Sequence, residues 1–190
     1  NATKKAIGVA LGKSPAKLTQ EDLSKVEKLD LFAAGITDIS PLAALSGLKR
    51  LDIVGNGIDD LGALTGLTSL EVLYACENKI SDLTPLASLP KLRVLHLRRN
   101  YVSDLTPLAE LASILSLDLE RNRVKGIAPL ANMHELNWLA LSFNRVSDIS
   151  PLAGAHNLRH LYLDLNGLSS ESDLSALSKL RFLKTLSLRG

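Results

Sequence analysis

Residues 92–113 read LRVLHLRRNYVSDLTPLAELAS, and the same spacing recurs along most of the chain. In the first half of this stretch, Leu95 and Leu97 alternate with other residues, which is typical of a half-buried β-strand. In the second half an apolar residue stands at every third position, which favours a short 3-10 or α turn over a long helix. Asn100 lies between the two halves. Each unit therefore predicts one strand, one turn and one short helical segment.

The unit is found seven times in succession, and each copy starts 22 residues after the last. The copies start at Val26, Leu48, Leu70, Leu92, Ile114, Leu136 and Leu158. A period of 20 to 29 residues with leucines at these places is the signature of the leucine-rich repeat, in which neighbouring units stack to bury a shared core. The next copy starts at Leu183, so the seventh is 25 residues long. We expect its extra residues in the stretch 169–173, in the turn toward the convex side.

The repeats predict an α/β fold: a leucine-rich-repeat solenoid with a curved parallel β-sheet on its concave face and short 3-10 or α turns on its convex face. Residues 26–190 form seven full repeats and part of an eighth. Residues 1–25 do not fit the repeat and are predicted to form a helical N-terminal cap. Within this cap, residues 4–12 have apolar residues at helical spacing, and Thr19 followed by Asp22 marks the start of a second helix.

Two further positions of the repeat have a structural interpretation. Six of the seven repeats hold an asparagine at the turn, and the first has Ala34 instead. A buried asparagine there can satisfy backbone groups of the turn without any ligand. Most repeats continue with the pattern D-[LI]-[ST]-P-L-A, as in residues 82–87. We expect the Ser or Thr to cap each helical segment, with the proline at its first position.

The whole pattern, L-x-x-L-x-L-x-x-N-x-I-x-D-[LI]-x-P-L-x-x-L after a helical cap, resembles the internalin-type leucine-rich repeats of bacterial surface and secreted proteins. The resemblance covers residues 4–190. It implies a non-catalytic module that binds another protein through its concave face. No immunoglobulin-like segment or cell-wall anchor follows the repeats, and the sequence stops at Gly190 inside a repeat. We therefore expect a further C-terminal portion, or a partner, to cover Leu186 and Leu188.

Composition excludes several classes of function. The formal net charge is +2 with no long run of like charge, so the chain has no electrostatic footprint for nucleic acid. No segment approaches the roughly 18 consecutive apolar residues of a membrane span. Cys76 is the single cysteine, which rules out an internal disulfide framework and a multi-cysteine metal site. The four histidines occupy different positions of the repeat, so we expect no metal site and no cofactor.

The outward positions of the strands are the candidate binding surface. In each repeat the two central leucines point into the core, so the residues around them face out of the sheet. Five of the seven aromatic residues fall on these positions, and Tyr, Trp and Arg dominate protein-binding hot spots. The alternative is that aromatic residues favour sheets and pack on their strand neighbours. The predicted partner-binding residues are Phe32, Tyr74, His96, Arg98, Arg99, Asp118, Glu120, Trp138, Phe143, Tyr162 and Asp164.

Charged residues on the same face are expected to form cross-strand pairs. The predicted cross-strand pairs are Arg98 with Glu120, Glu77 with Arg99, and His96 with Asp118. Lys28 with Asp30 and Arg50 with Asp52 are expected to pair by the same logic at the N-terminal end. An exposed pair contributes only about 0–1 kcal/mol, so the alternative is a solvated surface that neutralises itself. Such charges still influence which partner is accepted.

Catalytic interpretations are weak. Asp118 and Glu120 lie on one face, as paired carboxylates do in glycoside hydrolysis. We expect Arg98 and Arg121 to keep both carboxylates ionised, which works against a general acid. A Cys76–His96 nucleophile would need hydrogen-bond contact and an oxyanion hole, and the sequence indicates neither.

Two classes of function fit the sequence better than catalysis does. The first is a secreted or surface-exposed bacterial protein that binds a partner protein through its concave face. The second is an intracellular scaffold or regulatory subunit that binds a cytosolic enzyme such as a phosphatase. A structural role is a third interpretation, in which the C-terminal edge associates with another copy of the chain.

Overall fold

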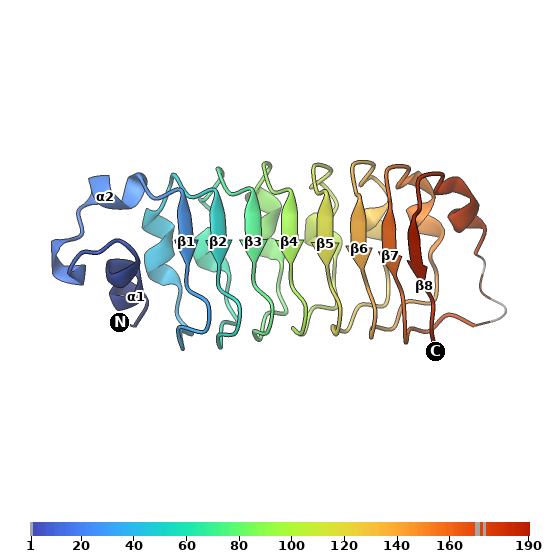
Figure 1. Ribbon diagram of the computed structural model, residues 1–190, viewed down its shortest axis with the longest axis horizontal. Coiled ribbons are helices and arrows are strands. Elements are labelled where there is room, and N and C mark those ends of the chain that lie inside the picture. Colours follow the sequence, from blue (N-terminus) through green and yellow to red (C-terminus); the bar gives the residue numbers. More distant parts are fainter. Residues whose placement is uncertain (1, 170–171, 173) are drawn as a thin grey trace.

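The computed structural model describes residues 2–169, 172 and 174–190. Figure 1 shows strands side by side in chain order, with the N-terminal helices beyond β1 and the other helical segments behind the sheet. The described strands form one parallel eight-stranded sheet in the order β1 to β8, which confirms the predicted solenoid. The strands are β1 Lys28–Asp30, β2 Arg50–Asp52, β3 Val72–Tyr74, β4 Val94–His96, β5 Ser116–Asp118, β6 Trp138–Ala140, β7 His160–Tyr162 and β8 Thr185–Ser187.

The strand register places equivalent residues of successive repeats side by side. Leu73 pairs with Leu95, and Leu95 pairs with Leu117. All three leucines are fully buried, because the middle residue of each strand points into the core. The two flanking residues of the strand then point to the opposite face of the sheet. The outward positions deduced from the sequence therefore form continuous rows across the sheet.

Short 3-10 helices lie opposite the sheet, as the three-residue apolar spacing predicts. They are η2 Ser40–Ala44, η3 Gly62–Leu64, η4 Thr84–Ser88, η5 Thr106–Leu108, η6 Ala128–Leu130, η7 Ser150–Gly154 and η8 Ser175–Lys179. The predicted capping by Ser or Thr side chains is wrong. In η4 the Thr84 backbone N–H donates to Asp82 Oδ1 at 2.8 Å, and Thr106 uses Asp104 in the same way. The aspartate lies two residues earlier, where its short side chain can accept this bond.

Asparagine side chains hold the turns between repeats, as predicted. Asn100 is only 4% exposed. Its Nδ2 donates to the carbonyl oxygens of Leu97 and Ala75, each at 2.9 Å, and its Oδ1 accepts from the N–H of Ile80 at 2.9 Å. Ala75 and Ile80 belong to the preceding repeat. One side chain therefore satisfies backbone groups of two neighbouring repeats.

The residue before each asparagine has a left-handed backbone. Gly55 occupies this place in the second repeat, with φ +71°. Other repeats hold long side chains there, including Arg99 (φ +56°), Arg121 (φ +55°) and Phe143 (φ +59°). A left-handed conformation is unfavourable for a residue with a Cβ, by roughly 1–2 kcal/mol. These turns therefore carry strain and place large side chains along the edge where the strands end.

Two α-helices and a 3-10 turn precede the sheet: α1 Ala2–Ala10, η1 Pro15–Lys17 and α2 Gln20–Ser24. The first helix begins two residues earlier than predicted and ends before Gly12, whose φ of +62° supplies the left-handed turn after it. Thr19 and Asp22 form a reciprocal capping box at the start of α2. Ile7 of α1 is buried and belongs to the same apolar core as the repeats.

The last described repeat differs from the others in exposure. Leu186 of β8 is 42% exposed, whereas the equivalent Leu161 of β7 is fully buried. Of the stretch 169–173, which was predicted to hold the extra residues, residues 170, 171 and 173 lie outside the described part of the chain. No helix among the described residues is both long enough and apolar enough to cross a membrane.

Candidate functional site on the concave sheet

A row of aromatic rings, each tilted against the next, crosses the concave face. The ring centroids of Tyr74 and His96 are 5.0 Å apart, those of His96 and Trp138 are 5.7 Å apart, and those of Trp138 and Tyr162 are 5.7 Å apart. The Arg50 guanidinium lies over the Tyr74 ring, 4.6 Å from its centroid, and extends the row by one strand. We call Tyr74, His96, Trp138 and Tyr162 the aromatic row. Its side chains are half-buried, because each ring covers part of the next.

The aromatic row is continuous because β5 contributes a small residue beneath it. Ser116 of β5 pairs in register with Trp138 of β6. The Ser116 hydroxyl forms a hydrogen bond with His96 Nε2 at 3.0 Å. Ala140, which also faces outward, is only 3% exposed, so its neighbours cover it. Small residues at these two places let His96 and Trp138 meet across an intervening strand.

Asp118 lies beside the aromatic row, in register with His96 and Ala140. Its Oδ1 accepts a hydrogen bond from the backbone N–H of Glu120 at 2.9 Å. Burial raises the pKa of the Asp118 carboxyl above its usual value. The carboxylate is thus held in a partly dehydrated place next to aromatic rings.

Arg98 and Arg121 were expected to keep both central carboxylates ionised, but among the described residues neither arginine forms an ion pair with Asp118. The Nε atoms of Arg98 and Arg121 lie 3.5 Å and 3.4 Å from Glu120 Oε1, so both arginines form ion pairs with Glu120. Arg98 has only a small effect on the pKa of Asp118, which burial dominates.

The predicted cross-strand pairs are formed in part. Arg98 meets Glu120, and Arg99 Nη1 lies 3.2 Å from Glu77 Oε1. His96 and Asp118 are neighbours in register, but among the described residues no ion pair joins them. Burial instead lowers the pKa of His96, which favours its neutral form.

Arg50 also departs from its predicted pairing with Asp52. Its guanidinium stacks on Tyr74, while Asp52 Oδ1 accepts from the backbone N–H of Val54 at 3.0 Å. Arg50 and Ser116 therefore belong to the aromatic row's surroundings, although neither was among the predicted binding residues. The strand register could have identified both residues, because Arg50 and Ser116 each lie on a strand next to one that carries an aromatic residue.

The other predicted residues lie away from the aromatic row. Phe143 is 37% exposed at the edge where the strands end, with the Arg121 guanidinium 3.9 Å from its ring centroid. Phe32 is 63% exposed near the N-terminal end of the sheet. Asp164 Oδ1 accepts hydrogen bonds from the Ser187 hydroxyl at 2.6 Å and from the Arg189 backbone N–H at 2.7 Å, which lower the pKa of this carboxyl. The carboxylate of Asp164 is therefore used to attach β8.

Cys76 is half-buried on the same face, and burial raises the pKa of its thiol to about 11. A thiol in such a place is a poor nucleophile at neutral pH. Among the described residues, no group of three His, Cys, Asp or Glu side chains is placed to hold a metal ion.

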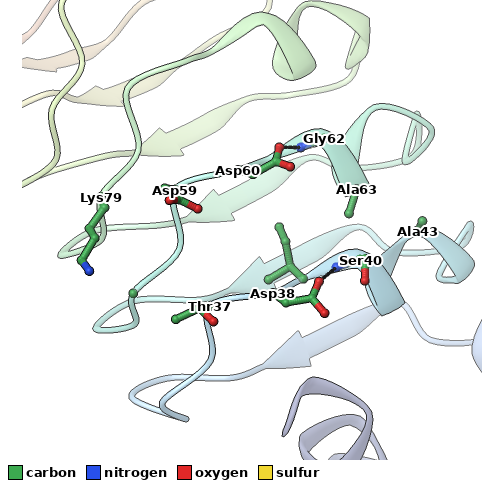
Figure 2. A pocket seen from close by; sticks show the side chains of 11 residues that line it. Thr37, Asp38, Ser40, Ala43, Asp59, Asp60, Gly62, Ala63 and Lys79 are labelled. Carbon is green, nitrogen blue, oxygen red and sulfur yellow. Dashed lines mark hydrogen bonds between the residues drawn. The ribbon is translucent and has the colours of Figure 1, made fainter. Parts of the chain in front are cut away.

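An open depression of about 650 Å³ lies elsewhere, on the flank of the first repeats. Figure 2 shows Asp38 and Asp60 in it, each with its carboxylate bonded to the backbone N–H two residues later. Lys79 and Thr37 also line it. Asp38 and Asp60 thus shape the two turns, and none of the aromatic row reaches this depression.

Comparison with known proteins gives the family. The signature described as Leucine Rich repeats (2 copies) matches residues 68–110, and a single Leucine Rich repeat signature matches residues 47–65. No curated protein sequence gives a significant match. Among solved structures, the plant peptide hormone receptor RGFR1 in complex with RGF2 has a TM-score of 0.71 at 20% identity over 80% of this chain and 26% of the receptor, which shows the shared fold.

Two internalins from Listeria monocytogenes are more similar. InlF is 34% identical with a TM-score of 0.93, over 97% of this chain and 54% of its own, so this chain spans about half of InlF. InlC2 is 33% identical with a TM-score of 0.93, over 98% of this chain and 82% of its own. Since a third of the residues are identical over nearly all of this chain and most of InlC2, the chain belongs to the internalin family of leucine-rich-repeat proteins.

Proposed function

We propose that this chain is a non-catalytic module that recognises a partner protein through the concave face of its sheet, and that it acts outside a bacterial cell, secreted or on the cell surface. The aromatic row is the observation that carries the proposal. Solenoids of stacked repeats use extended concave surfaces for binding, and the row lies across the middle of such a surface.

The arrangement of the aromatic row supports a binding role over simple sheet filling. Leucines already fill the interior, so the fold does not need Tyr74, Trp138 or Tyr162 for its core. Rings that already contact one another lose little conformational freedom when a partner binds, because their neighbours restrict them. Aromatic residues of this kind dominate the energy of protein interfaces.

The absence of a catalytic role is part of the proposal and rests on chemistry at the same face. Arg98 and Arg121 both lie within ion-pairing distance of Glu120, so its carboxylate is engaged in structural contacts. The raised pKa of Cys76 opposes a role as nucleophile. The sheet surface is open, whereas reacting groups are favoured by a site that excludes water.

The proposed location outside the cell is supported by the similarity to two internalins of a bacterium, Listeria monocytogenes. The competing function is an intracellular scaffold or regulatory subunit that binds a cytosolic enzyme. Both functions would use the same concave face, so they are separated by where the partner is found.

The test is a pull-down with the native chain from extracellular and cytosolic protein pools. A Tyr74→Ala/Trp138→Ala/Tyr162→Ala variant removes the aromatic row, and a Tyr101→Ala/Phe182→Ala variant is the matched control. The control residues are exposed aromatics outside the row. We expect a partner from the extracellular pool that is kept by the control and lost by the folded triple variant.

Other outcomes contradict parts of the proposal. A partner kept by both variants would place the binding site away from the aromatic row. A partner found only in the cytosolic pool would support the intracellular function. Self-association through the β8 edge, where Leu186 is exposed, would give a concentration-dependent mass in light scattering of the native chain.

A further inference from the structure

Asp118, at the centre of the concave face, forms no ion pair with any described residue. One of its carboxylate oxygens accepts the Glu120 N–H. In the part of the chain that the structure describes, no Lys, Arg or His nitrogen lies within ion-pairing distance of this carboxylate. A partly buried charge is unfavourable until it is paired. Asp118 therefore has an unmet preference for a cation.

The nearby cations of the chain lie against other groups, although the buried Arg98 Nε makes no hydrogen bond. Arg98 and Arg121 flank Glu120, and Arg50 lies over Tyr74. On β3 to β7 and the two residues that follow each of these strands, the outward positions hold three carboxylates, Asp118, Glu120 and Asp164, and one guanidinium, Arg98. The centre of the face is thus more acidic than basic, and it favours a basic group from outside.

The surroundings of Asp118 suit a flat cation. His96 and Trp138 lie on either side of β5, with ring centroids 5.7 Å apart, and Asp118 is on that strand. Its neighbour toward β6 is Ala140, which is only 3% exposed because larger side chains cover it. Aromatic faces attract cations, and a guanidinium can stack on a ring while its N–H groups donate to a carboxylate.

Within this chain, guanidinium groups already lie over aromatic rings. Guanidinium groups stack on aromatic rings at three places: Arg50 on Tyr74, Arg121 on Phe143 and Arg123 on Tyr101. The two central rings of the aromatic row, His96 and Trp138, have no such guanidinium among the described residues.

We infer that Asp118, framed by His96 and Trp138, receives an arginine side chain of the partner protein. This inference rests on the proposed function and adds to it the chemistry of the partner's anchoring residue. Burial disfavours the charged form of Asp118 and raises its pKa. A guanidinium beside the carboxylate offsets this cost by supplying a positive charge. Arginine is favoured over lysine because its planar group can stack and donate two parallel hydrogen bonds.

The single tryptophan makes the inference measurable. Trp138 is the only tryptophan of the chain, so its fluorescence reports on this place alone. The probes are two acetylated and amidated peptides, Gly-Gly-Arg-Gly-Gly and the same peptide with citrulline, the neutral isostere, in place of arginine. We expect the arginine peptide to change Trp138 fluorescence saturably, with an affinity at least tenfold above that of the citrulline peptide.

Variants assign the effect to one carboxylate. Asp118→Asn keeps the shape of the side chain and should abolish the preference for arginine. Asp52→Asn is the matched control, since Asp52 occupies the same outward position on β2 and bonds the N–H two residues later in the same way. This control should keep the preference. Circular dichroism of each variant checks that it is folded.

Three results would overturn the inference: equal affinity for both peptides, a preference that survives in Asp118→Asn, or no saturable change with the arginine peptide. Failure here is separate from failure of the proposed function. If a pull-down partner is lost with the aromatic row but still binds Asp118→Asn, the proposed binding function is supported and the arginine inference is rejected. If the arginine preference depends on Asp118 but no protein is captured from either pool, the cation site is supported and the proposed function is rejected.

Discussion

The rings of His96 and Trp138 are in contact range, with centroids 5.7 Å apart, although β5 separates the strands that carry them. The contact forms over Ser116, which binds the imidazole and leaves room for the indole. The two rings therefore belong to one surface, and a change in either should be felt along the aromatic row.

Truncation of the indole separates binding from folding. Trp138→Ala should lower the free energy of unfolding by about 1–3 kcal/mol, because it removes two ring pairs worth roughly 0.5–1.5 kcal/mol each. It should weaken the partner by about 2 kcal/mol or more. Leu97→Ala, in the buried core, should reduce stability by about 2–5 kcal/mol. Urea unfolding of both variants checks this, and a larger loss for Trp138→Ala would contradict its outward placement.

Removal of one turn asparagine should be costly. Asn100→Ala leaves the Ile80 N–H and two carbonyl groups without their buried partner, which should lower the free energy of unfolding by about 2–4 kcal/mol. Asn137→Ala is the control, since Asn137 makes one long hydrogen bond of 3.4 Å to Asn157, and should change stability by about 0.5 kcal/mol or less. Equal losses in chemical denaturation would show that the Asn100 bonds do not stabilise the fold.

Stability should fall on mild acidification because of His96. Its folded-state pKa lies below the ordinary 6.5, so the unfolded chain takes up a proton first as the pH falls through 6.5. The contribution of neutral His96 is therefore present above this pH and is lost as the pH falls toward the folded-state pKa. His96→Gln should flatten the dependence of unfolding free energy on pH between about 7.5 and 5.5.

The neighbouring carboxyl acts in the opposite direction. Because burial raises the pKa of Asp118, its protonation favours the folded state as the pH falls. The other groups packed against His96 are the Tyr74 and Trp138 rings and the Ser116 hydroxyl. Measuring the same slope in the Asp118→Asn background isolates the histidine. A slope that persists in Asp118→Asn/His96→Gln would assign it to another group.

The thiol should react slowly in the folded chain. With a pKa of about 11 instead of 9.0, Cys76 has a thiolate fraction at pH 8 that is about a hundredfold smaller than that of an ordinary cysteine. Alkylation by iodoacetamide at pH 8 should be slower by about this factor than in the urea-unfolded chain. Equal rates in the two states would mean that Cys76 is fully exposed to solvent.

Sequence alone predicts most of the fold because the repeat constrains it strongly. The spacing of Leu95 and Leu97 defines the inward and outward positions, and Asn100 defines the turn. The capping error has a physical origin. Both Asp82 and Thr84 can accept a backbone bond at a helix start, and only the three-dimensional turn shows that the aspartate takes it.

The candidate site was less predictable for a related reason. Sequence places Tyr74, His96, Trp138 and Tyr162 on the outward face. It does not show that their rings contact one another, because this depends on side-chain direction across strands. Sequence also does not show whether Arg50 contacts Asp52 or the Tyr74 ring, because an exposed ion pair and a cation–π contact are of similar strength. Whether these residues bind a partner is a proposal, which the pull-down and the peptide titration address.

The uniform register of the sheet has a consequence for how such a chain can change over generations. Each inner strand meets its neighbours through the same leucine pair, as Leu73, Leu95 and Leu117 do. The interior therefore does not distinguish one repeat from the next. Duplication of one unit would lengthen the concave face by about one strand spacing, roughly 4.8 Å, with no new core to invent. The reach of the surface and its chemistry can thus be inherited and altered independently.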